Sequence, residues 1–291
     1  MTPKSLVRSI HTLFSLPDVV IRVNRLIGEP NTRTADLAQA VLSDPGLATR
    51  LLRLVNSAYY GPRRRVETVS HAIILLGQRE LRDLMMGTVA VELFQGLPPE
   101  RVNMDRFWLH SVRCGIAARG LAQRQRLREG ERFFIAGLLH GVGKLIFYSQ
   151  YPERYREVLE RAGDDERARV AAERQVFGFT YAELSAELLK SWRLLEHLHP
   201  AIAYHLEPGK ATDCRREATI LHVAVQIANH MQTGTDGASA GAQTEQTPEH
   251  LASFARLLDL PPESLASLRD EIDSQAREIL KIIRPGATLP D

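Results

Sequence analysis

Residues 42–61 read LSDPGLATRLLRLVNSAYYG, and this stretch decides the fold class. Asp44 can cap a helix whose first position is Pro45. The apolar side chains that follow fall on one helical face: Leu47, Leu51, Leu54 and Val55. Asn56 is typical of a helix end, and Gly61 with its following proline prevents continuation. The pattern predicts a short amphipathic helix with a defined beginning and end.

Helical periodicity of this kind continues along nearly the whole chain, and strand alternation of useful length is missing. Further helices are expected over residues 6–13, 19–26, 36–42, 70–77, 80–94, 105–124, 131–149, 153–162, 165–177, 180–193, 197–206, 215–231, 250–258 and 262–283. Residues 232–247 are rich in Gly, Ser, Thr, Gln and Ala and predict a flexible loop. Pro98 and Pro99 prevent helix continuation and mark a boundary. The sequence therefore predicts an all-α chain of two packed helical subdomains, residues 1–97 and 98–291.

Composition excludes several classes of protein. Of the 291 residues, 44% are hydrophobic and 25% are charged, which excludes a fully disordered chain. No apolar run approaches the roughly 20 residues that a membrane span needs, and no secretory leader is visible, so we expect a cytoplasmic protein without membrane insertion. Cys114 and Cys214 form no C-x-x-C pair and are expected to be small buried groups. The net charge of +2 makes nucleic-acid binding unexpected.

Common catalytic motifs do not fit the chain. Residues 141–144 read GVGK, but a phosphate-binding P-loop would need glycine at position 138 and serine or threonine at position 145, where this chain has Leu138 and Leu145. The histidines offer another route to chemistry. Three of the ten lie in ordered helical contexts: His110 in WLHS, His140 in HGVGK and His222 in LHVAV.

This order of histidines resembles the HD superfamily of metal-dependent phosphohydrolases, and more closely the HDOD (HD-related output domain) family of bacterial signalling modules. The more specific similarity lies in the N-terminal half. Three stretches resemble HDOD signatures in their order and spacing: LSDPGL at 42–47, LLRLVNSAYYG at 51–61 and AIILLG at 72–77. The resemblance covers nearly the whole chain and implies an HD-like C-terminal subdomain.

The resemblance also implies where a metal would be held. Catalytic HD relatives supply one histidine, an adjacent His-Asp pair and a later aspartate, whose carboxylates balance a hard divalent cation. At these positions this chain has His110, then His140 followed by Gly141, and Val225 after His222. Where many relatives carry a histidine it has Tyr181. With both carboxylates missing, we expect no HD-type metal and no cofactor; Glu183 or His205 would be substitute ligands without support from spacing.

Structural interpretations account for the same residues. His110 and His140 would be buried polar groups with hydrogen-bonded rings, and Lys144, at the lysine position of the HD motif, would extend along an apolar helix toward solvent. A second group of residues follows the helix over 45–55: Asn56, Tyr59, Tyr60, Arg63, Arg64 and Arg65. This group is either a helix end with an aromatic plug and a solvated loop, or an interaction surface. The three arginines form the one dense basic run and would bind nucleic acid only with a steep salt dependence.

Two functions are consistent with these observations. The leading one is a non-catalytic bacterial signal-transduction module that binds a partner protein or a small ligand, with the groove between the subdomains as the expected surface. Because no receiver or cyclase module is recognisable, the partner is expected on another chain or as a second copy in a homodimer. The alternative is a divergent phosphohydrolase or phosphodiesterase acting on a nucleotide or cyclic dinucleotide, since His110, His140 and Lys144 are retained.

Overall fold

The chain is helical in all parts that the computed structural model describes, which are residues 1–10, 13–127, 130–163, 165–233 and 248–288. Strands are absent from these ranges, as the periodicity predicts. Most of the predicted flexible loop at 232–247 lies outside the described residues. No helix in the described ranges combines the length and the apolar character needed to cross a bilayer.

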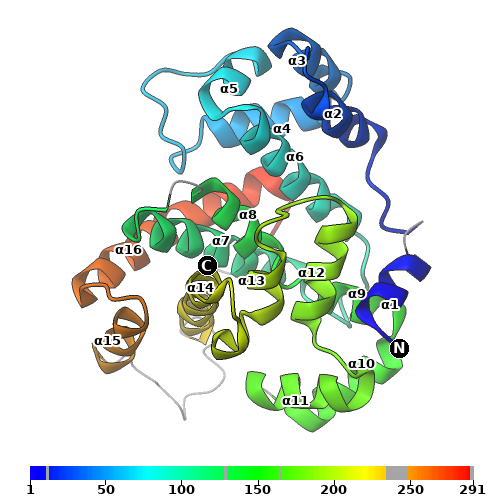
Figure 1. The fold of residues 1–291 in the computed structure, drawn as a ribbon, viewed down its shortest axis with the longest axis vertical. Coiled ribbons are helices and arrows are strands. Elements are labelled where there is room, and N and C mark those ends of the chain that lie inside the picture. Colours follow the sequence, from blue (N-terminus) through cyan, green and yellow to red (C-terminus); the bar gives the residue numbers. More distant parts are fainter. Residues whose placement is uncertain (11–12, 128–129, 164, 234–247, 289–291) are drawn as a thin grey trace.

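One group of helices forms the upper part of Figure 1. It comprises α2 (Asp18–Gly28), α3 (Thr34–Leu42), α4 (Pro45–Val55), α5 (Val69–Leu76) and α6 (Gln78–Leu93). The predicted cap of α4 is confirmed, because the Asp44 side chain accepts the Leu47 N–H at 2.9 Å. Thr68 caps α5, because its side chain accepts the N–H of His71 at 3.1 Å.

The second group is built around α7 (Met104–Arg124), which packs against α8, α14 and α16. Figure 1 shows these helices in the lower part of the molecule, with α11 at its far edge. The remaining bounds are α8 (Gly130–Leu139), α9 (Val142–Gln150), α10 (Pro152–Ala162), α11 (Glu166–Phe177), α12 (Tyr181–Ser191), α13 (His199–Tyr204), the 3-10 helix η1 (Pro208–Lys210), α14 (Arg215–Thr233), α15 (Pro248–Leu257) and α16 (Pro262–Ile283).

The prediction of one helix over residues 131–149 is wrong. The chain leaves the helix after Leu139 and starts α9 at Val142, with Gly141 at φ −98° and ψ 1° between them. Glycine favours such a break because its backbone loses more freedom in a helix than that of other residues. The break matters for the site, because His140 lies in the turn.

Contacts between distant segments join the two groups. The first helix, α1 (Pro3–Ile10), lies beside α12, away from the helices that follow it in sequence (Figure 1). The Trp192 indole N–H donates to the Phe14 carbonyl at 3.1 Å. One continuous cluster of buried apolar residues extends through both groups. The division at residues 97 and 98 stays a prediction.

Candidate functional site

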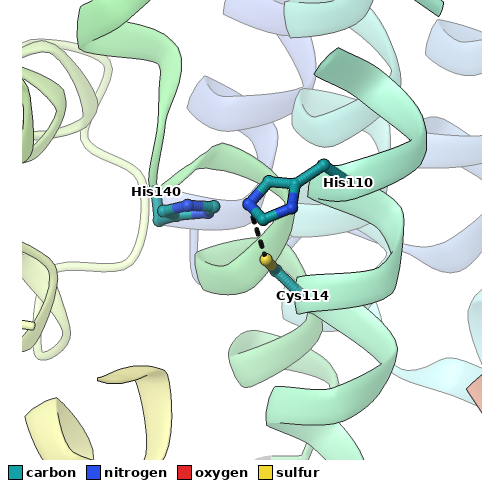
Figure 2. A group of neighbouring side chains, drawn as sticks. All are labelled: His110, Cys114 and His140. Carbon is teal, nitrogen blue, oxygen red and sulfur yellow. Dashed lines mark hydrogen bonds between the residues drawn. The ribbon is translucent and has the colours of Figure 1, made fainter. Parts of the chain in front are cut away.

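One helix and one turn bring together His110, Cys114 and His140 (Figure 2). His110 and Cys114 are one turn apart on α7, and the thiol sulfur lies 3.4 Å from the His110 Nε2. His140 faces them from the turn between α8 and α9, with its ring centre 5.7 Å from that of His110. One nitrogen or sulfur atom from each residue lies within 4.8 Å of the others. The cluster is therefore small enough to surround a single atom.

Backbone hydrogen bonds orient two of the histidine rings at this centre. His140 Nδ1 lies 2.7 Å from the Gly137 carbonyl, and His205 Nδ1 lies 2.7 Å from the Ile202 carbonyl. A carbonyl can only accept, so each Nδ1 carries the proton and each Nε2 has a free lone pair. The two rings meet edge to face with centres 5.3 Å apart. The Tyr181 hydroxyl lies 3.3 Å from the His205 Nε2 and can donate to it.

A close approach of α9 and α12 sets the other side of the centre. A Cβ atom at Gly143 would lie 2.2 Å from the Tyr181 carbonyl oxygen, so the position has no room for any other side chain. The Gly143 N–H also donates to the Ser185 hydroxyl at 2.8 Å. Because the helices touch here, the next residue, Lys144, is carried over the Tyr181 ring.

The Lys144 ammonium is part of the centre and does not extend into solvent as expected. Its nitrogen lies 3.1 Å from the Glu166 carboxylate and 4.1 Å from the centre of the Tyr181 ring, and its side chain is 16% exposed. Arg169 holds the second Glu166 oxygen at 3.0 Å. A fixed positive charge with its own carboxylate partner thus lies beside the histidines.

The surroundings keep the histidines neutral. Burial, together with the charge of Lys144, lowers the pKa of His110 to about 3; for His140, burial and then His110 lower the pKa to about 3. Burial raises the pKa of the Cys114 thiol, which therefore stays protonated. Burial opposes ionisation of Glu166 as well, but Lys144 and Arg169 outweigh it and lower its pKa to about 2.

The donor set does not fit the metal that the HD resemblance implies. A hard divalent cation needs carboxylate oxygens, and this centre offers two neutral imidazoles and a protonated thiol. Gly141 and Val225 occupy the two positions where carboxylates are expected. A Cβ atom added at Gly141 would have only the Phe107 ring within 4 Å, and Val225 packs in an apolar cluster with Cys114. The Lys144 ammonium would also repel a dication.

The structure gives the remaining site residues structural contacts. The His222 Nδ1 lies 2.8 Å from the His205 carbonyl, so this ring holds the backbone of the chain after α13. Glu183 is the reciprocal partner of the Thr180 cap at the start of α12 and is not directed at the centre. His205 is brought to the centre, although sequence spacing gave no reason to place it there.

Glu166 and Cys114 were missed by sequence reasoning. The spacing of four residues between Cys114 and His110 on a predicted helix is a signal that could have placed the thiol on the same face. Glu166 has no comparable signal, because its partner Lys144 lies 22 residues earlier on another helix.

The predicted interaction residues after α4 divide into two kinds. Asn56 holds its loop in place, since its amide group bonds the Val66 N–H and C=O, both at 2.8 Å. Tyr59 is buried, with the Arg119 guanidinium 4.1 Å above its ring. Tyr60 is half-buried and packs edge-on against Tyr59. The three arginines at 63–65 are exposed. The contacts of the first three residues agree with a helix end and an aromatic plug.

The fold and the histidine centre define an all-helical protein of HD type, with Gly141 and Val225 at the positions where the resemblance implies carboxylates. Comparison with known proteins identifies the family: the model of the HDOD domain matches residues 13–208, and the chain belongs to the HDOD family.

Other proteins resemble this chain over most of its length. A "Putative phosphohydrolase" from Shewanella amazonensis has the same fold, with a TM-score of 0.77, 24% identity and coverage of 96% of this chain and 98% of its own. The MmoQ response regulator from Methylococcus capsulatus has a TM-score of 0.50 and 26% identity, covering 86% of this chain and 95% of its own. A curated relative from Treponema pallidum, named an uncharacterized protein, is 29% identical over 258 residues, or 87% of this chain. The chain spans about half (48%) of that relative's length.

Proposed function

We propose that this HDOD protein is a non-catalytic signal-transduction module that recognises a partner protein or a small ligand. The observation that carries the proposal is the Lys144–Glu166 ion pair beside neutral His110 and His140. The Lys144 charge is balanced by Glu166 and acts on both histidines, which are the residues that would hold a dication in catalytic relatives. Recognition does not need the metal chemistry that such a centre lacks.

One comparison supports a signalling role, and the state of the cysteines supports the compartment. The MmoQ protein, which resembles this chain, is named a response regulator. Both cysteines are free thiols, as expected for a protein of the reducing cytoplasm, the compartment we propose. The partner would be another polypeptide or a second copy of this chain, and binding would shift the protein between two states.

The test measures metal and turnover in the same preparation. We expect purified protein incubated with Mn²⁺ and then desalted to retain far less than one equivalent of metal. We also expect no hydrolysis of bis(p-nitrophenyl) phosphate or of cyclic dinucleotides above background. Stoichiometric Mn, Fe or Mg with turnover that His140→Ala abolishes would overturn the proposal. The exposed His71→Ala is the matched control and should change nothing.

A divergent phosphohydrolase acting on a nucleotide or cyclic dinucleotide is the second candidate. The observation in its favour is the close grouping of donor atoms from His110, Cys114 and His140. Such a nitrogen and sulfur set suits softer ions better than magnesium. Turnover that depends on both His140 and Cys114 would favour this candidate over recognition alone.

A further inference from the structure

A groove of about 690 Å³ lies between the two groups of helices, away from the histidine centre. Its walls come from α2 and α6 on one side and from α8 and the residues after α12 on the other. The charged side chains that line it are strongly unequal in sign: Arg25, Arg79, Arg82, Arg132 and Arg193 face the single carboxylate of Glu196. The chain as a whole has nearly equal numbers of basic and acidic residues, so this grouping is a local property of the fold.

We propose that this groove binds a small molecule that carries two or more phosphate groups next to an apolar or aromatic moiety, the chemical class of nucleoside di- and triphosphates. The inference deepens the proposed function and rests on it, since it assigns a site and a ligand class to a module that acts by recognition. Guanidinium groups match phosphate oxygens with paired, charge-assisted hydrogen bonds.

A buried carboxylate pairs with two of the arginines that line the groove. Asp83 on α6 is about 1% exposed, with Arg82 at 2.7 Å and Arg132 at 3.5 Å. Arg132 comes from α8, so one carboxylate holds guanidiniums from both groups of helices. The two arginine side chains are only 20% and 13% exposed. Charges fixed in this partly buried position act more strongly on a bound anion than charges on a flexible exposed side chain.

Two arginines of the groove lack an internal partner. Arg79, in the first turn of α6, and Arg193, just after α12, are exposed and form no ion pair within the described part of the chain. They are therefore available to a ligand without breaking a native contact. Arg82 and Arg132 share the single negative charge of Asp83, and Glu196 offsets one further charge. With Arg79 and Arg193 these residues keep a net charge of about +2, which a diphosphate balances better than a monoanion.

The uncharged wall explains the second half of the proposed ligand. Leu16, Ile21 and Ile27 line the groove, and Ile21 is 53% exposed. An apolar or aromatic group seated on this wall would remove that surface from water. The volume lies within the range of about 300–1,000 Å³ typical of small-molecule sites.

Binding to the full-length chain tests the proposal. Isothermal titration at low ionic strength uses ADP, ATP, AMP, adenosine and pyrophosphate as probes, and Trp192 at the groove wall provides a fluorescence signal. We expect ADP and ATP to bind, AMP to bind at least about tenfold more weakly, and adenosine not to bind measurably. The Arg79→Gln/Arg193→Gln variant should weaken ADP binding by about tenfold or more. The control Arg269→Gln/Arg277→Gln removes two exposed arginines of α16 outside the groove and should leave binding unchanged.

Any of the following results would overturn the inference: no binding of ADP or ATP, equal weakening by the control variant, or binding of pyrophosphate as tight as that of ADP. A short oligonucleotide that binds more tightly than ADP would also overturn it. These outcomes are separate from the test of the proposed function. Failure to bind nucleotides would refute the groove as a ligand site and leave the proposed non-catalytic function untouched. Stoichiometric metal with turnover would refute the proposed function, whatever the groove binds.

Discussion

Replacing Gly143 with alanine is expected to destabilise the protein strongly, although alanine normally favours a helix. The new Cβ would lie 2.2 Å from the Tyr181 carbonyl oxygen and 3.0 Å from the Ser185 nitrogen. Both contacts are to backbone atoms of α12, which cannot rotate away as a flexible side chain can. The helices α9 and α12 must therefore separate by about 1 Å to reach an ordinary carbon–oxygen contact.

The magnitude follows from three contributions. Forcing extra volume into a packed interface costs about 1–3 kcal/mol, and losing the Gly143 N–H bond to the Ser185 hydroxyl costs about 1 kcal/mol more. Alanine recovers roughly 1 kcal/mol of helix propensity. The net loss of about 1–3 kcal/mol should lower Tm by roughly 2–6 °C for a chain of this size. Lys144, next in the chain, should also move away from the Tyr181 ring.

Thermal unfolding followed by circular dichroism measures the effect, with Gly141→Ala as the matched control. A Cβ at Gly141 would meet only the Phe107 ring, at 3.6 Å, and the backbone φ of −98° suits any residue. The control should change stability by less than about 1 kcal/mol. Equal Tm values for the two variants would refute the close approach of α9 and α12.

Three further perturbations test other parts of the structure. Burial raises the pKa of Glu173 to about 7, so the folded state keeps a proton that the unfolded chain releases. The free energy of unfolding should therefore fall by up to about 3 kcal/mol as pH rises from about 4.5 to 7. In urea unfolding at pH 5 and pH 8, Glu173→Gln should reduce this fall, and an unchanged fall would contradict the assignment. Val225→Asp places a carboxylate in the apolar cluster with Cys114 and should cost about 2–4 kcal/mol in the same assay, whereas an unchanged midpoint would show that the cluster is open to water. Asp83→Ala removes the carboxylate shared by Arg82 and Arg132 and should lower the free energy of unfolding by about 3 kcal/mol. A loss below about 0.5 kcal/mol would mean that water reaches these ion pairs.

Much of the helical architecture could be predicted because helix formation depends on neighbours in sequence. The apolar stripe of α4 and its Asp44 cap involve residues three or four positions apart, and the structure confirms the cap. The break at Gly141 was missed because an apolar run on both sides reads as one continuous helix. The packing of α9 against α12 also depends on this turn, and packing partners are not visible in local periodicity.

The candidate site was predicted in part. His110 and His140 were placed together through the family resemblance, and the structure brings them to the same centre. The surroundings of Lys144 could not be read in the same way, because Glu166 and Tyr181 reach it from other helices. The same limit applies to the arginine groove, whose members are spread from residue 25 to residue 193.

By itself, the sequence determined the helical class, the caps and the absence of side-chain carboxylates at positions 141 and 225, since these depend on residue identity and short spacing. The tertiary structure alone decided that an ammonium paired with Glu166 lies beside neutral histidines, and that five arginines gather in one groove. The physical reason is that electrostatic interactions depend on distance in space and on burial. Both are set when helices far apart in the chain pack together.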